Sequence, residues 1–335
     1  MNPPSQPIGF GSQVAANFQL AEQERRKKRL TGILTQDLPT LPTYVLDLNA
    51  LLNSPTVDLK KVGKIIRTDP SLSAQVLRLC NSALFGLRRR VLSIEQAAIL
   101  LGFERLRALV LTCSLMKFAG KRLPNSQLMA FWQHCFLTAL LSERIARHLD
   151  YFEKEQAYLC GLLHDIGQLP LSILALEEES KKRRLPPSGW LDNLPLERDY
   201  FGMDHAKVGR WMAVAWNFMP SFVDVFEHHH APERAEHDPY LVGIIATADQ
   251  FLMTLPASTT QALDGLTSEG MGSPEVASVV GPDDAFIQKC LPTVPEAECQ
   301  TLLEMLRIEY TQVLPLVQIG MANLVGESPE APESA

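Results

Sequence analysis

Apolar residues recur at helical spacing along most of the chain. The first two stripes consist of Leu46, Leu48, Leu51 and Leu52, and of Leu59, Val62, Ile65 and Ile66. Spacings of three and four residues place such side chains on one face of an α-helix. No segment alternates convincingly between apolar and polar residues with a period of two, as a half-buried strand would. The pattern therefore predicts an all-α fold.

Capping signals divide this pattern into separate helices. Asp69 before Pro70 predicts a helix start, because a carboxylate caps the first turn and proline suits the first helical position. Ser93 followed by Gln96 is typical of a capping box. Gly102 is expected to separate the helix after Ser93 from the next one, and Asp204 is expected to cap a helix over 205–218.

The same signals predict two helical lobes with extensions at both ends. A proline-rich lead-in at Leu38-Pro39-Thr40-Leu41-Pro42 opens the first lobe. A turn at 123–125 separates it from the second lobe. We expect the following organisation: a flexible, charged arm with a short solvated helix (1–30), a folded domain (31–256) with lobes at 38–122 and 126–256, a loop or partly ordered insertion (257–285), closing helices (286–325) and a disordered acidic tail (326–335).

Composition narrows the class of protein. The 335 residues are 46% hydrophobic and 21% charged, as in globular proteins, and the net charge is −7. A broad nucleic-acid surface needs a basic face, so nucleic acid is not an expected partner. The six cysteines lack metal-ligand spacing and are typical of buried thiols in a reducing compartment. No signal peptide is evident, and 106–116 is too short to cross a membrane, so we expect a cytoplasmic protein.

Candidate chemistry centres on Gly161-Leu162-Leu163-His164-Asp165-Ile166-Gly167. An adjacent His-Asp pair among apolar residues offers a nitrogen and an oxygen ligand to one Zn, Fe or Mn ion. Helical spacing places other polar residues on inward faces as well. His134 follows the stripe of its helix, and Asp249 is in register with apolar neighbours. The inward residues expected on three further segments are His205, His229 and His230.

A single inward histidine is usually a hydrogen-bonded core residue, so each of these residues also has a purely structural interpretation. Five of the eight histidines nevertheless fall on inward faces, together with two aspartates. Burying so many titratable groups without a shared partner would cost several kcal/mol. We therefore predict a divalent metal (Fe, Mn or Zn) held by His134, His164, Asp165, His229, His230 and Asp249. His205 is expected to be a ligand of a second site or a hydrogen-bond donor behind the ligands. A metal-free histidine core is the alternative.

The order His134, His164-Asp165, Asp249 resembles the HD superfamily of metal-dependent phosphohydrolases, and His205 with His229-His230 resembles its HD-GYP branch. The first lobe is more similar to HDOD domains, the HD-related output domains of bacterial signalling proteins. The motifs that carry this resemblance are Leu38-Pro39-Thr40-Leu41-Pro42, Asp69-Pro70-Ser71-Leu72, Asn81-Ser82-Ala83-Leu84-Phe85 and 94–102. The resemblance covers about 38–255 and implies an all-helical regulatory domain, often with an eroded metal site.

Departures from the HD-GYP pattern bear on activity. Gln168 stands where that branch has lysine, Ala231-Pro232-Glu233 replaces its Gly-Tyr-Pro, and Ala130 stands where a glutamate ligand of a third metal would lie. The sequence therefore predicts a signal-transduction module that binds a partner protein or small ligand, with a nucleotide among the candidates. No catalytic residues are assigned. The alternative is a metal-dependent phosphohydrolase, in which a metal-activated water attacks the phosphoester of a nucleotide or cyclic dinucleotide.

Overall fold

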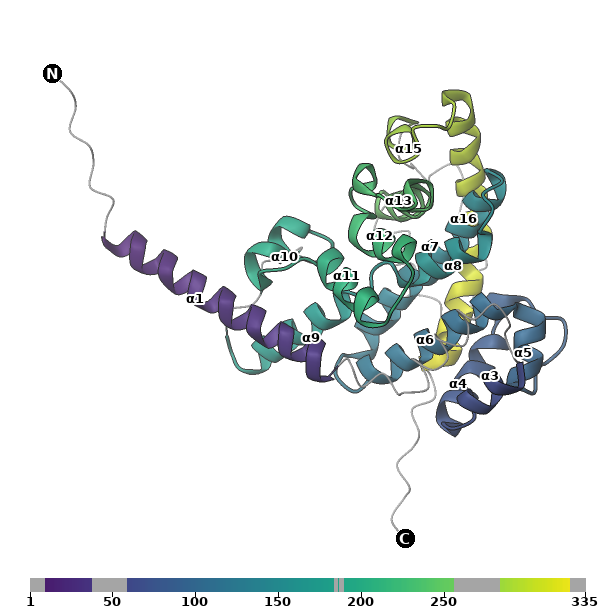
Figure 1. The fold of residues 1–335 in the computed structure, drawn as a ribbon, viewed down its shortest axis with the longest axis horizontal. Helices are drawn as coiled ribbons and strands as arrows, with labels where there is room; N and C mark the ends of the chain where they lie inside the picture. The colour runs from purple at the N-terminus through teal and green to yellow at the C-terminus, as the bar shows by residue number, and fades with distance from the viewer. Residues whose placement is uncertain (1–9, 38–58, 184–185, 187–189, 256–283, 326–335) are drawn as a thin grey trace, which may run out of the picture.

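The computed structural model describes residues 10–37, 59–183, 186, 190–255 and 284–325, and every regular element in these ranges is helical. This confirms the predicted all-α fold (Figure 1). The lead-in at 38–42, the stripe at 46–52, most of the expected 257–285 insertion and the expected acidic tail lie outside the described residues.

The first lobe is a small helical cluster at the lower right of Figure 1. Its elements are α3 (Leu59–Ile66), α4 (Pro70–Cys80), η2 (Ala83–Phe85), α5 (Ile94–Leu101) and α6 (Phe103–Ala119). Asp69 caps α4 by accepting the Leu72 N–H, and Ser93 caps α5 by accepting the Gln96 N–H, as predicted. Gly102 separates α5 from α6 with a φ of 81°, a value that suits glycine.

The second lobe surrounds α7 and α8, which pack closely together. Its elements are α7 (Asn125–His148), α8 (Lys154–Leu163), α9 (Gln168–Ser180), α10 (Leu194–Phe201), α11 (His205–Ala215), α12 (Pro220–His228), η3 (Pro232–Arg234) and α13 (Pro239–Met253). Gly161 allows the α7–α8 approach, because a Cβ there would lie 2.9 Å from the Cα of Ala139. The run Lys154–Ser180 is apolar and long enough to cross a membrane, but 83% of its apolar window is buried inside the protein, as in a core helix.

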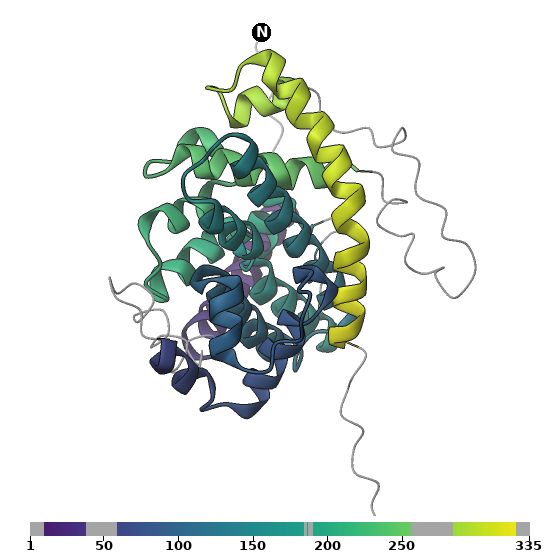
Figure 2. The same ribbon diagram turned by 90° about the vertical axis from the view of Figure 1, so that its right-hand side faces the viewer.

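The C-terminal helices tie the lobes together. After α15 (Asp284–Cys290), the long α16 (Glu296–Val325) packs on α7 of the second lobe and on α4 and η2 of the first. Figure 2 shows α16 running along the side of both lobes. Nε2 of His148, at the end of α7, lies 2.6 Å from Oε1 of Glu298 in α16, so this contact joins the two helices.

The N-terminal segment differs from the expected solvated arm. Residues Phe10–Gly32 form one helix, α1, which continues into the π-helical turn η1 (Ile33–Asp37) and contacts α9 and α10. The buried Arg26 donates to the Tyr200 carbonyl at 2.6 Å, and Gln23 donates to the carbonyls of Arg198 and Asp199. These α1 side chains satisfy the last carbonyls of α10, which have no partner within their own helix. The charges that suggested a solvated helix thus serve to dock it.

Candidate metal centre

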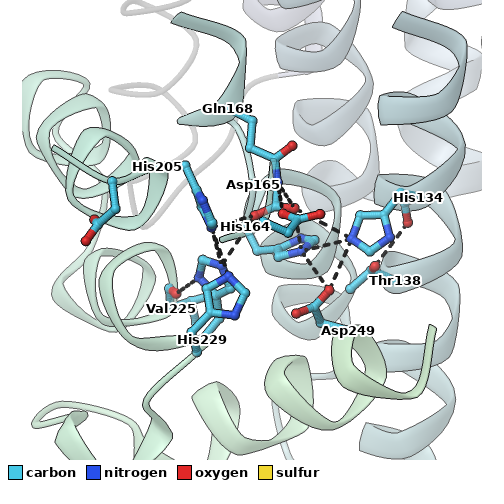
Figure 3. A network of polar contacts seen from close by, with 12 residues as sticks. His134, Thr138, His164, Asp165, Gln168, His205, Val225, His229 and Asp249 are labelled. Carbon is cyan, nitrogen blue, oxygen red and sulfur yellow. Dashed lines mark hydrogen bonds and ion pairs between the residues drawn. The ribbon is translucent and has the colours of Figure 1, made fainter. Parts of the chain in front are cut away.

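Asp165 lies in the middle of a buried cluster of histidines and carboxylates. It follows His164 in the turn between α8 and α9, where a continuous helix had been predicted. Figure 3 shows His205 and His229 on one side of Asp165, and His134 and Asp249 on the other. The two carboxylate oxygens of Asp165 therefore face two separate groups of side chains.

The first group contains His134 of α7, His164, Asp165 and Asp249 of α13. His134 Nε2 lies 3.4 Å from His164 Nε2, 3.1 Å from Asp249 Oδ1 and 3.6 Å from Asp165 Oδ2. His164 Nε2 lies 3.4 Å from Asp165 Oδ2 and 3.6 Å from Asp249 Oδ1. Two imidazole nitrogens and two carboxylates thus converge on one point, a donor set that suits a divalent transition metal.

The second group contains Asp165, His205, His229 and His230. Asp165 Oδ1 lies 3.3 Å from the Nε2 atoms of both His205 and His229. His205 Nε2 is also 2.9 Å from His230 Nε2. The ligand atoms of these four residues all lie within 4.8 Å of one another, as do those of His134, His164 and Asp165. Asp165 belongs to both groups.

Contacts behind the centre orient three of the imidazoles. His164 Nδ1 lies 2.8 Å from the Gly161 carbonyl, and His229 Nδ1 lies 3.0 Å from the Val225 carbonyl. A carbonyl only accepts, so each Nδ1 donates and leaves Nε2 free to act as a ligand. His205 Nδ1 is held in the same manner by the buried carboxylate of Glu197, at 2.8 and 2.9 Å. Nε2 of each ring therefore faces the centre.

Gly167 brings the second group within reach of Asp165. A Cβ at this position would lie 2.0 Å from the His205 carbonyl oxygen and 2.7 Å from the Gly209 amide nitrogen. Only a glycine lets the start of α11 approach the turn after the His-Asp pair so closely. Asp204 caps α11 by accepting the Lys207 N–H, as predicted, and this cap places His205 in the first turn.

The metal-free cluster is electrostatically loaded. Burial opposes the charged form of His134, but Asp249 and Asp165 outweigh it and raise the pKa of His134 to about 9. Burial is likewise outweighed at His205, where Asp165 and Glu197 raise the pKa to about 9. The pKa of Asp165 falls despite burial, because His164 and His205 surround it. Burial lowers the pKa of His230 to about 3. Protons on His134 and His205 thus balance the carboxylates where a metal would otherwise do so.

The residues present fit a metal. Asp165 Oδ1 is buried and accepts no hydrogen bond of good geometry, although buried carboxylate oxygens normally have a partner. It faces two Nε2 atoms at 3.3 Å, which is close to the separation expected between ligands of one ion. A divalent cation between these atoms would satisfy the oxygen and the nitrogens together.

Three polar residues at the centre were not assigned a part in it from the sequence. The Gln168 side chain donates to Asp165 Oδ2 at 2.7 Å and also to Asp192 Oδ1. Burial and the charge of Asp165 raise the pKa of Asp192 to about 7. Asp192 and Glu197 lie in a stretch expected to be a loop. Asn193, which caps α10, and Pro195 were the local signals for a helix there.

All seven predicted ligands come together, but their grouping differs from the expected one. His229 and His230 join His205 on the Oδ1 side of Asp165 instead of completing a single shell with His134 and His164. His205 points its Nε2 into the cluster with the others. His148 and His237 lie outside, paired with Glu298 and Asp224, as their predicted structural role requires.

Comparison with known proteins gives a consistent family assignment. The sequence matches the HDOD domain family over residues 38–232. A crystal structure from Shewanella amazonensis SB2B, provisionally named a phosphohydrolase, is 25% identical, has a TM-score of 0.58, and covers 87% of this chain and 97% of its own. An HDOD domain protein of unknown function from Geobacter sulfurreducens is 23% identical, with a TM-score of 0.61 and coverage of 89% and 98%.

A curated relative, an uncharacterised protein of Treponema pallidum (strain Nichols), is 25% identical over 256 residues. The alignment covers 73% of this chain and 48% of the relative, so the chain spans about half the length of that protein. The family match extends over more than half of this chain and includes His134, the His-Asp pair and the histidines after α12. This chain belongs to the HDOD domain family.

Proposed function

We propose that this protein is a cytoplasmic regulatory module of bacterial signal transduction that holds two divalent metal ions, Fe, Mn or Zn. The observation that carries the proposal is the position of Asp165 between two groups of ligands. His134, His164 and Asp249 would hold one ion with Asp165 Oδ2. His205, His229 and His230 would hold the other with Asp165 Oδ1. A shared carboxylate is a usual bridge in two-metal sites.

The surroundings of Gln168 favour regulation over catalysis. Its side-chain nitrogen donates to two carboxylates, Asp165 and Asp192, so it is not available to a substrate. A lysine at this position, as in the HD-GYP branch, would offer a positive charge to a phosphate. The HDOD family, to which the chain belongs, resembles output domains that act through binding. The proposed role is therefore to bind a partner protein or small ligand in a manner that depends on the metal centre.

A phosphohydrolase is the second candidate. It is favoured by the two-metal arrangement, and by the provisional name of the Shewanella relative. When bound, divalent ions supply Lewis acidity to a phosphoryl group and lower the pKa of water. Asp165 would hold both ions in register, and Glu197 would keep the His205 tautomer that binds metal.

Elemental analysis tests the metal centre directly. Protein purified without chelator or affinity-tag metals is compared with Asp165→Ala and with His148→Ala, which removes a histidine that contacts Glu298 outside the centre. We expect Fe, Mn or Zn at between one and two ions per chain in wild type and His148→Ala, and a loss of both in Asp165→Ala. A folded wild-type protein without bound metal, also after reconstitution, would contradict the proposal.

A second experiment separates the two candidates. The metal-loaded protein is incubated with bis(p-nitrophenyl) phosphate and with a cyclic dinucleotide, and release of nitrophenol or mononucleotide is measured. The regulatory proposal predicts no turnover above that of Asp165→Ala. Metal-dependent turnover that is lost in Asp165→Ala and retained in His148→Ala would favour the phosphohydrolase.

A further inference from the structure

A cavity of about 760 Å³ lies directly beside the metal centre. Its walls come from the first half of α7, from α9, from the segment before α10 and from the end of α13. The apolar side chains that form most of these walls include Phe131, Leu169, Ala175, Leu176, Trp190 and Leu191. This volume is within the range of about 300–1,000 Å³ that is typical of small-molecule sites, which are also mainly apolar.

The cavity and the metal centre share a wall. His134 and Gln168 line the cavity and also belong to the centre. The His134 side chain is 22% exposed, whereas those of His164 and His205 are completely buried. Since His134 is the ligand that opens toward the cavity, a molecule bound there would lie against the first metal group.

The charge of the lining decides which class of molecule fits. Glu179 and Asp192 are the acidic residues of the lining, and none of its described residues is Lys or Arg. Among the described lining residues, His134 at the metal centre is the only cationic group, so an anion in the rest of the cavity would meet Glu179 and Asp192 and none of the guanidinium or ammonium groups that anion sites normally supply. Gln127 and Ser172 add a few uncharged polar groups. The lining therefore suits an uncharged molecule with an apolar body.

The mouth of the cavity has the same character. Leu191 and Met253 lie there, and each is 48% exposed. Burying two large half-exposed apolar side chains under a ligand is favourable by about 25 cal/mol for each Å² covered. A second cavity, in the first lobe, differs in kind because Arg78, Arg89 and Arg90 line it. The protein therefore contains an internal comparison between an acidic apolar cavity and a basic one.

We propose that the cavity between α7 and α9 binds an uncharged, largely apolar small molecule whose polar end reaches His134. This rests on the proposed regulatory function and deepens it, because it names the class of ligand that the module would sense. It also separates the site from that of a nucleotide hydrolase, whose substrate is anionic.

A matched pair of dyes tests the proposal. N-Phenyl-1-naphthylamine is uncharged and apolar, and 8-anilino-1-naphthalenesulfonate is the same skeleton with a sulfonate. Fluorescence titration is performed on the full chain with metal and after chelation. Ala175→Trp fills the cavity from α9, and Ala74→Trp makes the same change in the arginine-lined cavity. Ser172→Phe, a smaller intrusion from the same wall, serves if Ala175→Trp does not fold.

The uncharged dye should bind wild type and Ala74→Trp equally and should lose about tenfold or more in affinity in Ala175→Trp. Binding of the sulfonated dye, wherever it occurs, should be unchanged by Ala175→Trp and Ser172→Phe. The proposal is overturned if the uncharged dye does not bind, if folded cavity variants bind it normally, or if filling the cavity weakens the sulfonated dye equally. Dye binding to chelated protein that lacks any metal affinity would contradict the metal centre while leaving the cavity assignment intact.

Discussion

Glu197 and His205 form a buried carboxylate–imidazole pair that joins helix α10 to the metal centre. The Nδ1 atom of His205 lies 2.8 and 2.9 Å from the two oxygens of Glu197, and the His205 backbone N–H donates to the same carboxylate at 2.7 Å. Nδ1 therefore carries the proton, and Nε2 faces Asp165. The orientation of His205 depends on a residue eight positions earlier, on another helix.

Glu197→Gln should weaken the second metal site while leaving the first nearly intact. The amide is a weaker acceptor and can present its NH₂ to Nδ1, which would favour the wrong tautomer. Loss of such a partner typically lowers metal affinity by about 10–100-fold. Metal titration by calorimetry, with one and two equivalents resolved, measures the change.

The matched control is Glu178→Gln, because Glu178 is equally buried but pairs with Arg25 of α1. It should leave both metal affinities unchanged. Equal effects of the two variants on the second site would show that Glu197 has no specific orienting role.

Arg26→Ala should destabilise the protein by about 2–3 kcal/mol, the usual range for a buried hydrogen bond from a charged donor with an added cation–π contact. Arg26 is buried, donates to the Tyr200 carbonyl, and lies 4.1 Å from the centre of the Tyr200 ring. Urea denaturation followed by circular dichroism measures the free energy of unfolding. Lys28→Ala, an exposed change on the same helix, should stay within about 0.5 kcal/mol of wild type. A similar result for both variants would mean that α1 docking contributes little.

Gly167→Ala should cost about 3 kcal/mol and also lower metal content, because the new Cβ would overlap the backbone of α11 at His205. Thermal unfolding and elemental analysis together measure both effects. Gly32→Ala provides the opposite expectation: its Cβ would meet nothing closer than 3.6 Å, and alanine favours a helix by about 0.5–1 kcal/mol. Normal stability and metal content in Gly167→Ala would contradict the close approach of α11.

Metal affinity should rise with pH up to about 9. In the metal-free protein the carboxylates around His134 and His205 outweigh burial and raise the pKa of each to about 9. A metal needs the neutral imidazole and must displace these protons, so each displaced proton costs up to about tenfold in affinity per pH unit below 9. Titrations at three pH values in buffers of different ionisation enthalpy measure the proton release. Affinity independent of pH would contradict the assigned protonation.

The same pKa shifts set the pH dependence of the metal-free protein. Both histidines have pKa values raised above the ordinary value of 6.5, so their contribution to stability is complete below pH 6.5 and is lost as pH rises through about 9. The chelated protein should therefore unfold at a lower temperature at pH 9.5 than at pH 6.5 as far as these groups decide it. Metal-loaded protein should lack this loss, because the ion replaces the protons.

Local patterns in the sequence were sufficient to predict the all-α fold, several helix starts and the inward faces of the polar residues. The spacing of apolar residues around His134 and Asp249 identified the buried side of each helix, and Asp69, Ser93 and Asp204 identified helix starts. These features depend on residues within one or two turns of each other. The family resemblance could be recognised for the same reason, since its motifs are short and occur in a fixed order.

Results

Sequence analysis

Apolar residues recur at helical spacing along most of the chain. The first two stripes consist of Leu46, Leu48, Leu51 and Leu52, and of Leu59, Val62, Ile65 and Ile66. Spacings of three and four residues place such side chains on one face of an α-helix. No segment alternates convincingly between apolar and polar residues with a period of two, as a half-buried strand would. The pattern therefore predicts an all-α fold.

Capping signals divide this pattern into separate helices. Asp69 before Pro70 predicts a helix start, because a carboxylate caps the first turn and proline suits the first helical position. Ser93 followed by Gln96 is typical of a capping box. Gly102 is expected to separate the helix after Ser93 from the next one, and Asp204 is expected to cap a helix over 205–218.

The same signals predict two helical lobes with extensions at both ends. A proline-rich lead-in at Leu38-Pro39-Thr40-Leu41-Pro42 opens the first lobe, and a turn at 123–125 separates it from the second. We expect the following organisation: a flexible, charged arm with a short solvated helix (1–30), a folded domain (31–256) with lobes at 38–122 and 126–256, a loop or partly ordered insertion (257–285), closing helices (286–325) and a disordered acidic tail (326–335).

Composition narrows the class of protein. The 335 residues are 46% hydrophobic and 21% charged, as in globular proteins, and the net charge is −7. A broad nucleic-acid surface needs a basic face, so nucleic acid is not an expected partner. The six cysteines lack metal-ligand spacing and are typical of buried thiols in a reducing compartment. No signal peptide is evident, and 106–116 is too short to cross a membrane, so we expect a cytoplasmic protein.

Candidate chemistry centres on Gly161-Leu162-Leu163-His164-Asp165-Ile166-Gly167. An adjacent His-Asp pair among apolar residues offers a nitrogen and an oxygen ligand to one Zn, Fe or Mn ion. Helical spacing places other polar residues on inward faces as well. His134 follows the apolar stripe of its helix, and Asp249 is in register with apolar neighbours. The inward residues expected on the remaining segments are His205, His229 and His230.

A single inward histidine is usually a hydrogen-bonded core residue, so each of these residues also has a purely structural interpretation. Five of the eight histidines nevertheless fall on inward faces, together with two aspartates. Burying so many titratable groups without a shared partner would cost several kcal/mol. A metal-free histidine core remains the alternative to a metal site. The divalent metal that we predict (Fe, Mn or Zn) is held by His134, His164, Asp165, His229, His230 and Asp249, with His205 as a ligand of a second site or a donor behind the ligands.

The order His134, His164-Asp165, Asp249 resembles the HD superfamily of metal-dependent phosphohydrolases, and His205 with His229-His230 resembles its HD-GYP branch. The first lobe is more similar to HDOD domains, the HD-related output domains of bacterial signalling proteins. The motifs that carry this resemblance are Leu38-Pro39-Thr40-Leu41-Pro42, Asp69-Pro70-Ser71-Leu72, Asn81-Ser82-Ala83-Leu84-Phe85 and 94–102. The resemblance covers about 38–255 and implies an all-helical regulatory domain, often with an eroded metal site.

Departures from the HD-GYP pattern bear on activity. Gln168 stands where that branch has lysine, Ala231-Pro232-Glu233 replaces its Gly-Tyr-Pro, and Ala130 stands where a glutamate ligand of a third metal would lie. We therefore expect a signal-transduction module that binds a partner protein or small ligand, with a nucleotide among the candidates. No catalytic residues are assigned. The alternative is a metal-dependent phosphohydrolase, in which a metal-activated water attacks the phosphoester of a nucleotide or cyclic dinucleotide.

Overall fold

The computed structural model describes residues 10–37, 59–183, 186, 190–255 and 284–325, and every regular element in these ranges is helical. This confirms the predicted all-α fold (Figure 1). The lead-in at 38–42, the stripe at 46–52, most of the expected 257–285 insertion and the expected acidic tail lie outside the described residues.

The first lobe is a small helical cluster at the lower right of Figure 1. Its elements are α3 (Leu59–Ile66), α4 (Pro70–Cys80), η2 (Ala83–Phe85), α5 (Ile94–Leu101) and α6 (Phe103–Ala119). Asp69 caps α4 by accepting the Leu72 N–H, and Ser93 caps α5 by accepting the Gln96 N–H, as predicted. Gly102 separates α5 from α6 with a φ of 81°, a value that favours glycine.

The second lobe surrounds α7 and α8, which pack closely together. Its elements are α7 (Asn125–His148), α8 (Lys154–Leu163), α9 (Gln168–Ser180), α10 (Leu194–Phe201), α11 (His205–Ala215), α12 (Pro220–His228), η3 (Pro232–Arg234) and α13 (Pro239–Met253). Gly161 allows the α7–α8 approach, because a Cβ there would lie 2.9 Å from the Cα of Ala139. The run Lys154–Ser180 is long and apolar enough to cross a membrane, but 83% of its apolar window is buried inside the protein, as in a core helix.

The C-terminal helices tie the lobes together. After α15 (Asp284–Cys290), the long α16 (Glu296–Val325) packs on α7 of the second lobe and on α4 and η2 of the first. Figure 2 shows α16 running along the side of both lobes. Nε2 of His148, at the end of α7, lies 2.6 Å from Oε1 of Glu298 in α16, so this contact joins the two helices.

The N-terminal segment differs from the expected solvated arm. Residues Phe10–Gly32 form one helix, α1, which continues into the π-helical turn η1 (Ile33–Asp37) and contacts α9 and α10. The buried Arg26 donates to the Tyr200 carbonyl at 2.6 Å, and Gln23 donates to the two preceding carbonyls of α10. These α1 side chains therefore bind backbone carbonyls at the C-terminal end of α10. Arg26, one of the charged residues that suggested a solvated helix, therefore joins α1 to α10.

Candidate metal centre

Asp165 lies in the middle of a buried cluster of histidines and carboxylates. It follows His164 in the turn between α8 and α9. Figure 3 shows His205 and His229 on one side of Asp165, and His134 and Asp249 on the other. The two carboxylate oxygens of Asp165 therefore face two separate groups of side chains.

The first group contains His134 of α7, His164, Asp165 and Asp249 of α13. His134 Nε2 lies 3.4 Å from His164 Nε2, 3.1 Å from Asp249 Oδ1 and 3.6 Å from Asp165 Oδ2. His164 Nε2 lies 3.4 Å from Asp165 Oδ2 and 3.6 Å from Asp249 Oδ1. Two imidazole nitrogens and two carboxylates thus converge, and this donor set suits a divalent transition metal.

The second group contains Asp165, His205, His229 and His230. Asp165 Oδ1 lies 3.3 Å from the Nε2 atoms of both His205 and His229. His205 Nε2 is also 2.9 Å from His230 Nε2. The ligand atoms of these four residues all lie within 4.8 Å of one another, as do those of His134, His164 and Asp165. Asp165 belongs to both groups.

Contacts behind the centre orient three of the imidazoles. His164 Nδ1 lies 2.8 Å from the Gly161 carbonyl, and His229 Nδ1 lies 3.0 Å from the Val225 carbonyl. A carbonyl only accepts, so each Nδ1 donates and leaves Nε2 as the ligand atom. His205 Nδ1 is held in the same manner by the buried carboxylate of Glu197, at 2.9 and 2.8 Å. Nε2 of each ring therefore faces the centre.

Gly167 brings the second group within reach of Asp165. A Cβ at this position would lie 2.0 Å from the His205 carbonyl oxygen and 2.7 Å from the Gly209 amide nitrogen. Only a glycine lets the start of α11 approach the turn after the His-Asp pair so closely. Asp204 caps α11 by accepting the Lys207 N–H, as predicted, and this cap places His205 in the first turn.

Carboxylates and protonated imidazoles balance each other in the metal-free cluster. Burial opposes the charged form of His134, but Asp249 and Asp165 outweigh it and raise the pKa of His134 to about 9. Burial is likewise outweighed at His205, where Asp165 and Glu197 raise the pKa to about 9. At His230, burial lowers the pKa to about 3. Protons on His134 and His205 thus supply the positive charge that a metal would otherwise bring.

The residues present fit a metal. Asp165 Oδ1 is buried and accepts no hydrogen bond of good geometry, although buried carboxylate oxygens normally have a partner. It faces two Nε2 atoms at 3.3 Å, a separation that suits neighbouring ligands of one ion. A divalent cation between these atoms would satisfy the oxygen and the nitrogens together.

Three polar residues at the centre were not assigned a part in it from the sequence. The Gln168 side chain donates to Asp165 Oδ2 at 2.7 Å and also to Asp192 Oδ1. Burial and the charge of Asp165 raise the pKa of Asp192 to about 7. Asp192 lies just before α10, and Glu197 lies within it. Asn193, which caps α10, was the local signal for a helix there.

All seven predicted ligands come together, but their grouping differs from the expected one. His229 and His230 join His205 on the Oδ1 side of Asp165 instead of completing a single shell with the residues of the first group. His205 points its Nε2 into the cluster with the others. His148 and His237 lie outside the cluster and contact Glu298 and Asp224.

Comparison with known proteins gives a consistent family assignment. The sequence matches the HDOD domain family over residues 38–232. A crystal structure from Shewanella amazonensis SB2B, provisionally named a phosphohydrolase, is 25% identical, has a TM-score of 0.58, and covers 87% of this chain and 97% of its own. An HDOD domain protein of unknown function from Geobacter sulfurreducens is 23% identical, with a TM-score of 0.61 and coverage of 89% and 98%.

A curated relative, an uncharacterised protein of Treponema pallidum (strain Nichols), is 25% identical over 256 residues. The alignment covers 73% of this chain and 48% of the relative, so the chain spans about half the length of that protein. The family match extends over more than half of this chain and includes His134, the His-Asp pair and the histidines after α12. This chain belongs to the HDOD domain family.

Proposed function

We propose that this protein is a cytoplasmic regulatory module of bacterial signal transduction that holds two divalent metal ions, Fe, Mn or Zn. The observation that carries the proposal is the position of Asp165 between two groups of ligands. The first group, with Asp165 Oδ2, would hold one ion, and the second group, with Asp165 Oδ1, would hold the other. Asp165 would thus be the ligand that the two groups share.

The surroundings of Gln168 favour regulation over catalysis. Its side-chain nitrogen donates to two carboxylates, Asp165 and Asp192, so it is not available to a substrate. A lysine at this position, as in the HD-GYP branch, would offer a positive charge to a phosphate. The proposed role is therefore to bind a partner protein or small ligand in a manner that depends on the metal centre.

A phosphohydrolase is the second candidate. It is favoured by the sharing of Asp165 between two ligand groups, and by the provisional name of the Shewanella relative. When bound, divalent ions supply Lewis acidity to a phosphoryl group and lower the pKa of water. Asp165 would be a ligand of both ions, and Glu197 would maintain the His205 tautomer that binds metal.

Elemental analysis tests the metal centre directly. Protein purified without chelator or affinity-tag metals is compared with Asp165→Ala and with His148→Ala, which removes a histidine outside the centre. We expect Fe, Mn or Zn at about one to two ions per chain in wild type and His148→Ala, and its loss in Asp165→Ala. A folded wild-type protein that binds no metal, even after reconstitution, would contradict the proposal.

A second experiment separates the two candidates. The metal-loaded protein is incubated with bis(p-nitrophenyl) phosphate and with a cyclic dinucleotide, and release of nitrophenol or mononucleotide is measured. The regulatory proposal predicts no turnover above that of Asp165→Ala. Metal-dependent turnover that is lost in Asp165→Ala and retained in His148→Ala would instead favour the phosphohydrolase.

A further inference from the structure

A cavity of about 760 Å³ lies directly beside the metal centre. Its walls come from the first half of α7, from α9, from the segment before α10 and from the end of α13. The apolar side chains that form most of these walls include Phe131, Leu169, Ala175, Leu176, Trp190 and Leu191. This volume is within the range of about 300–1,000 Å³ that is typical of small-molecule sites, which are also mainly apolar.

The cavity and the metal centre share a wall. His134 and Gln168 line the cavity and also belong to the centre. The His134 side chain is 22% exposed, whereas those of His164 and His205 are completely buried. Since His134 is the ligand that opens toward the cavity, a molecule bound there would lie against the first metal group.

The charge of the lining decides which class of molecule fits. Glu179 and Asp192 are its acidic residues, and none of the described lining residues is Lys or Arg. Among the described lining residues, His134 at the metal centre is the only cationic group, so an anion in the rest of the cavity would meet Glu179 and Asp192 and none of the guanidinium or ammonium groups that anion sites normally supply. Gln127 and Ser172 add uncharged polar groups. The lining therefore suits an uncharged molecule with an apolar body.

The exposed part of the lining includes two large apolar side chains. Leu191 and Met253 are each 48% exposed, and Gln127 and Glu179 are the exposed polar residues beside them. A ligand that covers these side chains removes apolar surface from water, which favours binding. A second cavity, of about 830 Å³ in the first lobe, differs in kind because Arg78, Arg89 and Arg90 line it. The protein thus offers a direct comparison between an apolar, acidic cavity and a basic one.

We propose that the cavity between α7 and α9 binds an uncharged, largely apolar small molecule whose polar end reaches His134. The proposal rests on the regulatory function and deepens it, because it names the class of ligand that the module would sense. Such a ligand differs from the anionic substrate of a nucleotide hydrolase.

A matched pair of dyes tests this proposal. N-Phenyl-1-naphthylamine is uncharged and apolar, and 8-anilino-1-naphthalenesulfonate has the same skeleton with a sulfonate. Both are titrated by fluorescence into the full chain, with metal and after chelation. Ala175→Trp fills the cavity from α9, and Ala74→Trp makes the same change in the arginine-lined cavity. Ser172→Phe, a smaller intrusion from the same wall, serves if Ala175→Trp does not fold.

The uncharged dye should bind wild type and Ala74→Trp equally and should lose about tenfold or more in affinity in Ala175→Trp. Binding of the sulfonated dye, wherever it occurs, should be unchanged by Ala175→Trp and Ser172→Phe. The proposal is overturned if the uncharged dye does not bind or if folded cavity variants bind it with normal affinity. It is also overturned if these variants lower the affinity for the sulfonated dye as much as the affinity for the uncharged dye. If the uncharged dye binds in the cavity but the protein binds no metal, the proposed metal centre is contradicted and the proposed class of ligand still stands.

Discussion

Glu197 and His205 form a buried carboxylate–imidazole pair that joins helix α10 to the metal centre. His205 Nδ1 lies 2.8 and 2.9 Å from the two oxygens of Glu197, and the His205 backbone N–H donates to the same carboxylate at 2.7 Å. Nδ1 therefore carries the proton, and Nε2 faces Asp165. The orientation of His205 thus depends on a residue of a separate helix.

Glu197→Gln should weaken the second metal site while leaving the first nearly intact. The amide is a weaker acceptor and can present its NH₂ to Nδ1, which would favour the wrong tautomer. Loss of such a partner typically lowers metal affinity by about 10–100-fold. Metal titration by calorimetry, with the first and second equivalents resolved, measures the change.

The matched control is Glu178→Gln, because Glu178 is equally buried but pairs with Arg25 of α1. It should leave both metal affinities unchanged. Equal effects of the two variants on the second site would show that Glu197 has no specific orienting role.

Arg26→Ala should destabilise the protein by about 2–3 kcal/mol, the usual range for a buried hydrogen bond from a charged donor with an added cation–π contact. Arg26 is buried, donates to the Tyr200 carbonyl, and lies 4.1 Å from the centre of the Tyr200 ring. Urea denaturation measures the free energy of unfolding. Lys28→Ala, an exposed change on the same helix, should stay within about 0.5 kcal/mol of wild type. A similar result for both variants would mean that α1 docking contributes little.

Gly167→Ala should cost about 3 kcal/mol and also lower the metal content, because the new Cβ would overlap the backbone of α11 at His205. Thermal unfolding and elemental analysis measure the two effects. Gly32→Ala should instead raise the stability slightly. Its Cβ would meet nothing closer than 3.6 Å, and alanine favours a helix over glycine by about 0.5–1 kcal/mol. Normal stability and metal content in Gly167→Ala would contradict the close approach of α11.

Metal affinity should rise with pH up to about 9. In the metal-free protein the carboxylates around His134 and His205 outweigh burial and raise the pKa of each to about 9. A metal needs the neutral imidazole, so each displaced proton costs up to about tenfold in affinity for each pH unit below 9. Titrations at several pH values, in buffers of different ionisation enthalpy, measure the proton release. Affinity independent of pH would contradict the assigned protonation.

The same pKa shifts affect the stability of the metal-free protein. Both histidines have pKa values raised above 6.5, so their contribution is complete below pH 6.5 and is lost as pH rises through about 9. The chelated protein should therefore lose stability between pH 6.5 and 9.5, as measured by urea denaturation. The metal-loaded protein should not show this loss, because the ions replace the protons; the same loss in both forms would contradict the prediction.

Local patterns in the sequence were sufficient to predict the all-α fold, several helix starts and the inward faces of the polar residues. The spacing of apolar residues around His134 and Asp249 identified the buried side of each helix, and Asp69, Ser93 and Asp204 identified helix starts. These features depend on residues within one or two turns of each other, which the sequence displays directly. The resemblance to HDOD domains could be recognised for the same reason, because its motifs are short and occur in a fixed order.

The meeting of these residues was decided only by the tertiary structure. Asp165 is shared by two groups because Gly167 lets the backbone of α11 approach it, and Glu197 orients His205 because α1 and α11 hold α10 in place. Each of these contacts joins separate helices, so no local spacing encodes it. The apolar periodicity tells which side of a helix is buried, whereas the packing of side chains between helices determines which buried groups become neighbours.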